Sequence, residues 1–222
     1  MARKRVAILI SGRGSNMAAL IKATLAGDYP AEIAIVLSDT PGVAGIGRAQ
    51  AAKIRTGVVD RAAYPNKAAF EAALQAEIEA AEADLICLAG FMRILSADFV
   101  SRWPDRIINI HPSILPSFRG IDTHQRAIEA GVKLHGCTVH FVRAEVDAGP
   151  IIAQAAIAVL PDDTAESLAD RLLMAEHQLY PQALGWVASG RARIEDGRVV
   201  VDGVADQREN AMMVPTEADG SR

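Results

Sequence analysis

The chain has 222 residues, of which 50% are hydrophobic and 23% are charged, and its formal net charge at pH 7 is −4. This composition is typical of a globular protein with an apolar core, and it argues against the clustered basic surface that nucleic-acid binding needs. The apolar run 6–10 is too short for a signal peptide or a membrane span, so we expect a cytoplasmic protein with no membrane partner. The two cysteines, Cys87 and Cys137, lie in β-like apolar runs, which favours buried thiols over a disulfide.

In the first half of the chain, continuous apolar runs alternate with segments of helical periodicity. Such runs are typical of parallel strands that are covered on both faces, and the segments between them supply the covering helices. We therefore expect a doubly wound, Rossmann-like α/β unit with strands at 6–10, 33–37, 57–59 and 85–89 and helices at 17–25, 46–53 and 66–81.

The pattern changes in the second half, where the strands no longer alternate regularly with helices. The sequence predicts a strand at 107–110, a proline-punctuated loop at 111–119, a helix at 123–130, and strands at 136–142 and 151–157. The spacing of the last two strands suits a hairpin, so the mostly parallel sheet should become mixed in the C-terminal half.

The C-terminal segments are marked by capping and turn residues. Asp163 and Glu166 form a capping-box pattern for a helix at 165–189, Gly190 should end it, and Pro181 should kink or break it. A small hairpin is expected at 193–201 around Asp-Gly, and the polar tail 206–222 is expected to be flexible.

A glycine-rich loop, Ser-Gly-Arg-Gly-Ser-Asn at 11–16, joins the first predicted strand to the first helix. Backbone N–H groups at such a helix start can cradle an anion. The dinucleotide pattern Gly-x-Gly-x-x-Gly is incomplete because Met17 takes the third glycine's place, so the loop favours a phosphomonoester over NAD. A plain strand-to-helix turn is the alternative.

Asn109 and His111 lie at the C-terminal edge of a predicted strand, within the sequence Asn-Ile-His-Pro-Ser. Alternation along a strand points both side chains to the same side, where both can address one reacting atom. An amide can stabilise an oxyanion and an imidazole can supply or relay a proton, as acyl-type transfer requires. A histidine at a sheet end can also be merely structural.

Asp147 lies in the Asp-Ala-Gly-Pro loop between the two later strands. Such a residue usually just makes a turn. The functional alternative is a carboxylate that closes onto His111 and keeps its imidazole protonated near neutral pH. The loop by itself leaves both interpretations open.

His135 and His140 have the residue type of a metal site but not its geometry. On a strand they are five residues apart and face opposite sides, so we expect no metal there. His140 is more consistent with a structural partner of the active site.

Taken together, these motifs resemble the formyltransferase family that uses 10-formyltetrahydrofolate. The similarity covers 5–203 and includes the glycine loop, Leu-Ala-Gly-Phe-Met-Arg-Ile-Leu at 88–95, Asn-Ile-His-Pro-Ser at 109–113, Leu-Pro at 115–116, the segment from His140 to Pro150, and Glu-His with Tyr-Pro at 176–181. Within the family, Ser-Gly-x-Gly-Ser-Asn points to the branch that formylates glycinamide ribonucleotide in purine biosynthesis.

The resemblance implies the fold, the substrates and a role for individual residues. It implies a single domain over 1–205, with a ribonucleotide-phosphate half at 1–100 and a folate and catalytic half at 101–205. The implied catalytic residues are Asn109, His111 and Asp147, supported by His140 and Ser113. The ribonucleotide would be held by Gly12, Arg13, Gly14, Ser15, Asn16 and Glu176. The folate would be held by Leu88, Met92, Arg93, Ile94, Leu95, Val142, Ala144, Glu145 and Val146.

The implied mechanism is direct attack of an amine on the formyl carbon of 10-formyltetrahydrofolate, with no metal, in a monomer or homodimer. The Leu115–Pro116 bond is expected to be cis. One departure from the family is Leu173, which stands where a polar phosphate partner would be useful.

Three alternatives remain open. A methionyl-tRNA formyltransferase would share the three catalytic residues but should carry a basic tRNA-binding domain, for which we expect no room in this acidic chain. A formyltetrahydrofolate deformylase shares the core but normally adds an N-terminal regulatory domain. A non-catalytic ligand-binding module on the same fold would have no reason to place Asn109, His111 and Asp147 together.

Overall fold

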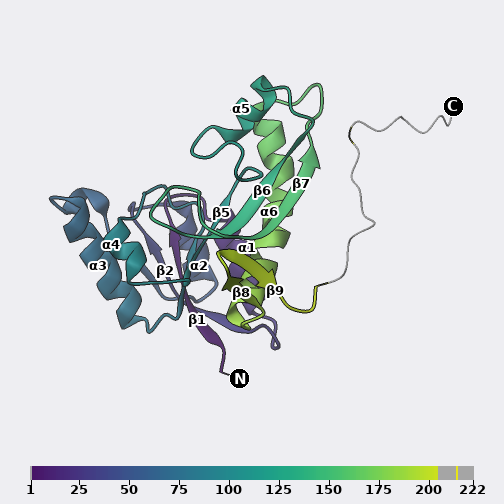
Figure 1. Ribbon diagram of the computed structural model, residues 1–222. Helices are drawn as coiled ribbons and strands as arrows, with labels where there is room; N and C mark the ends of the chain where they lie inside the picture. The colour runs from purple at the N-terminus through teal and green to yellow at the C-terminus, as the bar shows by residue number, and fades with distance from the viewer. Residues whose placement is uncertain (1, 205–213, 215–222) are drawn as a thin grey trace.

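The computed structural model describes residues 2–204 and residue 214, and it is built on a seven-stranded sheet (Figure 1). The spatial strand order is β3-β2-β1-β4-β5-β6-β7. The strands are β1 (Lys4–Ile10), β2 (Ala31–Ser38), β3 (Thr56–Val58), β4 (Leu85–Leu88), β5 (Ile107–His111), β6 (Leu134–Phe141) and β7 (Ile151–Ala158). The first five are parallel, whereas β6 and β7 run antiparallel to their neighbours, which confirms the predicted mixed sheet.

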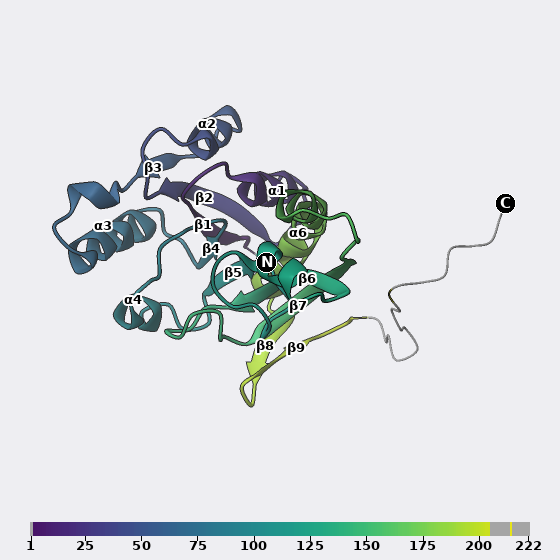
Figure 2. The same cartoon turned by 90° about the horizontal axis from the view of Figure 1, so that it is seen from above.

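Helices cover both faces of the sheet, as the continuous apolar strands require. Figure 2, seen from above, places α3 and α4 on one face and α1 and α6 on the other. The helices are α1 (Ser15–Thr24), α2 (Ala44–Ala51), α3 (Lys67–Ala80), α4 (Ala97–Ser101), α5 (Thr123–Glu129) and α6 (Ala165–Ala188), with a 3-10 turn at Arg61–Ala63. An apolar core lies on each face of the sheet, and alternate residues of β1 belong to one core or the other. Ile8 packs with α1 and α6, and Leu9 packs with α3.

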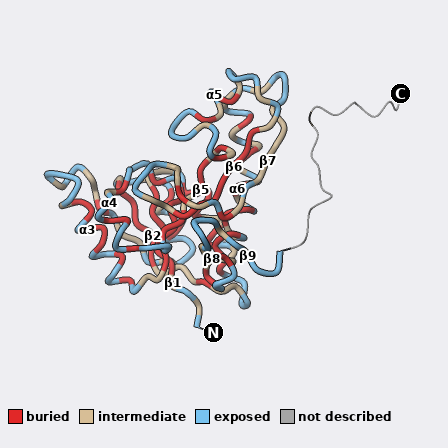
Figure 3. Tube along the Cα trace, in the orientation of Figure 1, coloured by how far each residue is buried: buried red, intermediate tan, exposed pale blue. Residues whose placement is uncertain are grey.

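The strands are the most deeply buried part of the chain, and the surface loops are exposed (Figure 3). Val6–Ile10 has no exposed surface, and Phe70, Leu74 and Ile78 of α3 form the apolar stripe that the sequence predicts. Burying a side chain of this size stabilises the fold by about 1.5–3 kcal/mol. The two cores therefore fix the sheet rigidly, and the strand ends can hold a site.

One sequence prediction about α6 is wrong. The capping box is formed by Thr164 and Ser167, not by Asp163 and Glu166. The carboxylate of Asp163 is instead bound by the Leu160 amide, the Ser167 hydroxyl and the Arg171 guanidinium, which keeps this residue outside the helix.

Pro181 does not break the helix, and the alternative, a kink at Pro181, stays a prediction. An interior proline costs about 3 kcal/mol, but Leu179, Tyr180, Ala183 and Leu184 bury the helix on both sides of it, and this packing outweighs the loss.

The chain continues after α6 into a small hairpin formed by β8 (Ala192–Glu195) and β9 (Arg198–Val201). Asp196 and Gly197 both have positive φ, as the predicted two-residue turn requires. Within residues 2–204 we find no helix that is both long and apolar enough to cross a bilayer. The predicted tail 206–222 lies outside the described residues except for Val214, and the division into halves at residue 100 stays a prediction.

Candidate active site

The predicted catalytic residues meet at the end of β5, where it pairs with β6. Asn109 lies directly opposite His140, and His111 lies directly opposite Thr138. Since residues two apart on a strand share a face, all four side chains lie on one side of the sheet. The structure therefore brings together the amide and the imidazole that the sequence predicts as partners.

Asp147 reaches this group from the loop between β6 and β7. Its Oδ2 atom lies 3.4 Å from His111 Nδ1, and its Oδ1 atom lies 3.8 Å from His140 Nε2. The Gly120 amide donates to Oδ2 at 2.9 Å. A Cβ atom on Gly149 would lie 1.7 Å from the Phe141 carbonyl oxygen, so only glycine allows the loop to pass this close to β6.

His111 is buried, with 5% of its surface exposed, and both of its ring nitrogens face acceptors. Nε2 lies 3.0 Å from the Phe118 carbonyl oxygen, which can only accept, so Nε2 carries a proton. Nδ1 faces the Asp147 carboxylate. With hydrogen on both nitrogens, the ring can donate to both partners at once.

His140 has a different set of partners. Its Nδ1 donates to the Phe141 carbonyl at 3.0 Å, which leaves Nε2 to accept from the Asn109 amide at 3.3 Å. Burial lowers the pKa of His140, against smaller opposite effects of the Phe141 carbonyl and Asp147. A neutral His140 therefore orients the Asn109 amide, whose second N–H remains available to a ligand.

Ser113 does not point a reactive group into the site. Its side chain is fully buried, and its hydroxyl donates to the Ser117 carbonyl at 2.6 Å. Its role is to fold the turn that follows His111, and the Leu115–Pro116 peptide bond in this turn is cis, as predicted.

The predicted phosphate loop leads from β1 into α1 and is packed tightly against α2. Gly14 is the N-cap of α1, with φ of 70° and no side-chain cap, so the first N–H groups of the helix are open to an anion. A Cβ on Gly45 would lie 2.8 Å from the Gly12 oxygen, so a glycine of α2 allows the close packing. Ser15 begins the helix, and Arg13 is exposed beside it.

Asn16 and Glu176 are brought together from opposite ends of the chain. The Asn16 amide donates to Glu176 Oε2 at 2.6 Å, and both side chains are largely buried. Burial raises the pKa of Glu176, and the bond from Asn16 partly opposes this effect. Leu173, one turn earlier on α6, supplies no polar group. Asp39, the acidic residue after β2, is bound by Arg93 at 2.6 Å.

The predicted folate residues do not all lie at the surface. Met92 and Ile94 are 70% and 64% exposed, whereas Leu88 and Leu95 are each 6% exposed and belong to the core beside α3 and α4. The Met92 amide donates to the Ser11 hydroxyl, which links this segment to the phosphate loop. The remaining predicted residues are Val142, which packs on the same core, and Ala144, Glu145 and Val146 in the Asp147 loop.

The sequence reasoning missed two cations near this segment. A pocket of about 120 Å³ is lined by Arg61, Lys67, Phe70, Glu71, Arg93 and Ile94. Arg61 and Lys67 come from segments that carry no motif, so only the fold reveals that they lie beside Arg93. A larger depression of about 460 Å³ lies near Arg3, Tyr29 and Ser189 and contains none of the predicted site residues.

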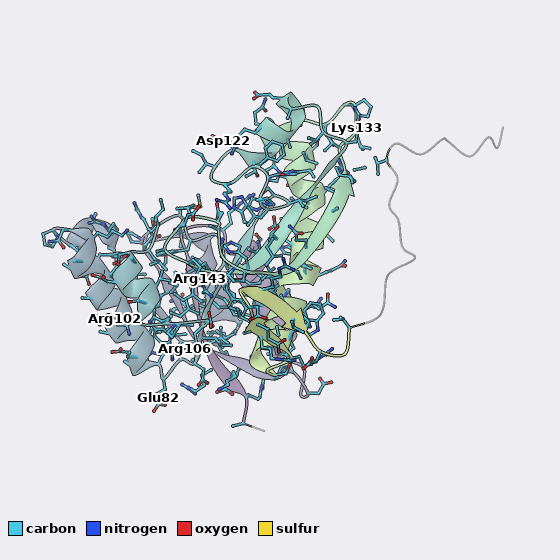
Figure 4. The ribbon with its side chains drawn as sticks, viewed as in Figure 1. Glu82, Arg102, Arg106, Asp122, Lys133 and Arg143 are labelled. Carbon is cyan, nitrogen blue, oxygen red and sulfur yellow. The ribbon has the colours of Figure 1, made fainter. Side chains whose placement is uncertain are left out.

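His135 lies beside the turn that follows His111, with its ring centroid 6.2 Å from that of Phe118. Its Nε2 atom lies 3.2 Å from Nδ1 of His124. Burial, with a smaller contribution from His124, lowers the pKa of His135 to about 4. Within the described part of the chain, no three His, Cys, Asp or Glu residues are placed to hold a metal ion. Figure 4 shows Asp122 and Lys133 on either side of α5, far from Arg102 and Arg106.

The amide and imidazole at the end of β5, with the carboxylate of the β6–β7 loop beside them, suit an enzyme of acyl-type group transfer, and the family comparison agrees. Residues 4–184 match the formyl transferase family, so the chain belongs to that family. The phosphoribosylglycinamide formyltransferase of Haemophilus influenzae is 42% identical over 202 residues, which cover 91% of this chain and 95% of that protein.

Some relatives are much longer proteins. It is 49% identical to the trifunctional purine biosynthetic protein adenosine-3 of Bos taurus over 198 residues, which are 89% of this chain and 20% of that protein. The chain thus spans about a fifth of the trifunctional relative's length.

Solved structures extend the comparison to the fold. The glycinamide ribonucleotide transformylase 1 of Symbiobacterium toebii matches with a TM-score of 0.87 and 46% identity, covering 90% of this chain and 94% of that one. A formyltetrahydrofolate deformylase from Pseudomonas syringae pv. tomato matches with a TM-score of 0.83 but 28% identity, covering 90% of this chain and 66% of that one.

Proposed function

We propose that this chain transfers the formyl group of 10-formyltetrahydrofolate to the amine of glycinamide ribonucleotide. The observation that carries the proposal is the convergence of Asn109, His111 and Asp147 at the end of β5, with Asn109 oriented by His140. The names of the relatives that match over nearly their whole length supply the formyl acceptor, and the formyl transferase family supports a formyl-folate as the donor.

The two substrates would be held by different residues around this group. The open N–H groups at the start of α1, with Arg13 beside them, suit the phosphate of the ribonucleotide, and Glu176 suits a ribose hydroxyl. The exposed apolar side chains of Met92 and Ile94 suit the flat pterin and benzoyl rings.

The pocket lined by Arg61, Lys67 and Arg93 suits the other end of the folate. The glutamate of a folate carries carboxylates, and the three cations beside Ile94 attract them, although Glu71 lies near Lys67 and Asp39 binds Arg93. The Asp147 loop, with Ala144, Glu145 and Val146, would close over the pterin end.

In the reaction, the substrate amine forms a bond to the formyl carbon, and the formyl oxygen becomes an oxyanion. The free N–H of Asn109 and the imidazolium of His111 stabilise that charge, which is worth about 10²–10³-fold in rate for one donor. Asp147 accepts the proton that the attacking amine loses. The oxyanion then re-forms the carbonyl as the carbon–nitrogen bond to the folate breaks, and the folate nitrogen receives the proton that Asp147 accepted from the amine. The reaction forms no covalent enzyme intermediate.

The experiment mixes the protein with 10-formyltetrahydrofolate, with and without glycinamide ribonucleotide, and follows both the folate and the formylated product. We expect the formyl group to be lost only when the ribonucleotide is present. Loss without ribonucleotide would instead support the deformylase, and binding of both ligands without any loss would support a non-catalytic module. We extend the proposal to a cytoplasmic location, since the free, buried Cys87 and Cys137 suit a reducing compartment.

A further inference from the structure

Thr138 and Gln154 continue the line of paired residues that begins at His111. Thr138 on β6 pairs with His111 on one side and with Gln154 of β7 on the other. The three residues therefore form a row across β5, β6 and β7, which lie side by side in Figure 1. No step of the proposed reaction uses Thr138 or Gln154, although both share the face of the sheet on which His111 lies.

The two side chains bind the backbone of the turn after His111. The Thr138 hydroxyl donates to the Ser113 carbonyl at 2.7 Å and accepts from the Leu115 amide at 3.0 Å. The Gln154 amide donates to the Leu115 carbonyl at 2.9 Å and to the Thr138 hydroxyl oxygen at 3.0 Å. Two side chains thus satisfy three backbone groups of this turn, and Thr138 is fully buried.

The same turn delivers the acceptor for His111. Three residues beyond Leu115, the Phe118 carbonyl accepts the Nε2 proton of His111 at 3.0 Å. Phe118 has a φ of 53°, a conformation that a phenylalanine keeps only where its surroundings impose it. The preceding turn, in which the Ser113 hydroxyl also binds the Ser117 carbonyl, therefore helps to fix the position of this carbonyl.

With hydrogen on both ring nitrogens, His111 donates to the Phe118 carbonyl on one side and faces the Asp147 carboxylate on the other. If the turn moved away, the Nε2 proton would lose its acceptor, only the contact with Asp147 would remain, and the ring would lose its fixed orientation. We propose that Thr138 and Gln154 are positioning residues that hold the Phe118 carbonyl on His111 Nε2. The role in turnover rests on the proposed function, whereas the hydrogen bond itself does not.

The test compares Thr138→Val, which removes only the hydroxyl, with Thr138→Ser, which restores it. Gln154→Ala is a second probe, because Gln154 lies on an exposed edge strand and its loss should leave the fold intact. Matched controls are Thr24→Val and Gln50→Ala, which each remove a hydrogen bond elsewhere. Thermal unfolding verifies that every variant folds.

The direct readout is the imidazole ¹H–¹⁵N NMR signal of His111 Nε2, which needs no turnover. We expect a protected Nε2 proton in the parent protein, in Thr138→Ser and in both controls, and its loss in Thr138→Val and Gln154→Ala. In the formyl-transfer assay, the kcat of these two variants should fall about tenfold while both KM values stay unchanged. An unchanged Nε2 signal in both folded variants would overturn the proposal, and so would a rise in KM alone. If the parent protein transfers no formyl group, the proposed function fails, and the NMR arm still decides the positioning role.

Discussion

Replacing Gly149 with alanine should displace the loop that carries Asp147. The added Cβ would lie 1.7 Å from the Phe141 carbonyl oxygen, and real Cβ atoms do not approach other atoms closer than 3.0 Å. The loop must therefore move by about 1.3 Å, since the partner atom belongs to the backbone of a buried strand. Asp147 Oδ2, two residues away and 3.4 Å from His111 Nδ1, would move with it.

A misplacement of about 1 Å at a catalytic group costs roughly 100-fold in rate, and forcing an extra carbon into a packed site costs about 1–3 kcal/mol of stability. We expect both effects in Gly149→Ala, measured as kcat for formyl transfer and as the free energy of unfolding in urea.

Gly47→Ala is the matched control, because a Cβ at this exposed helical position meets nothing within 4 Å. It should leave turnover unchanged and stabilise the fold by about 0.5–1 kcal/mol. A Gly149→Ala protein with parental kcat and stability would refute the reasoning, and so would an equal loss in the control.

Three further predictions concern charge. Asp147→Asn keeps the acceptor for the Gly120 amide but removes the negative charge beside His111. The kcat should therefore fall by about 10²–10⁴-fold. A fall of less than threefold would remove the carboxylate from the mechanism. Between pH 6.5 and pH 4, His135 is neutral in the folded chain and protonated in the unfolded chain, so stability should fall as the pH falls through this window, by up to about 3 kcal/mol. Urea unfolding from pH 4 to 7 measures this slope, which His135→Asn should flatten. Lys67→Ala should raise the KM for folate several-fold at low salt and leave kcat unchanged, and an unchanged KM would exclude the pocket as the glutamate site.

The local periodicity was enough to predict most of the sheet and the shared orientation of Asn109 and His111. Apolar runs gave the parallel strands, and the two-residue spacing of Asn109 and His111 placed both on one face without any knowledge of the fold. Asp147 carried no such signal. Its loop is joined to β6 and β7 by sequence but to His111 only through space, so the family resemblance had to supply its role.

Other features depended on contacts that a sequence does not display. In the sequence, Thr138 is one more residue of a β-like run. Only the structure shows that its hydroxyl binds the backbone of the turn after His111. Arg61 and Lys67 come from segments distant from Arg93 along the chain. The capping box lies one residue later than predicted because the Asp163 carboxylate binds Arg171 instead of capping the helix. Local sequence spacing does not reveal which of these two partners Asp163 binds.

Replacing Asn109 with alanine tests most directly whether this group of residues carries the reaction. The account predicts that kcat for formyl transfer falls about 100-fold or more, while folate and ribonucleotide still bind with parental dissociation constants. Asn66→Ala is the control, because its side chain caps α3 and its loss should lower stability by about 1 kcal/mol without changing turnover. If Asn109→Ala turns over at the parental rate, Asn109 does not stabilise the oxyanion and the central claim is contradicted.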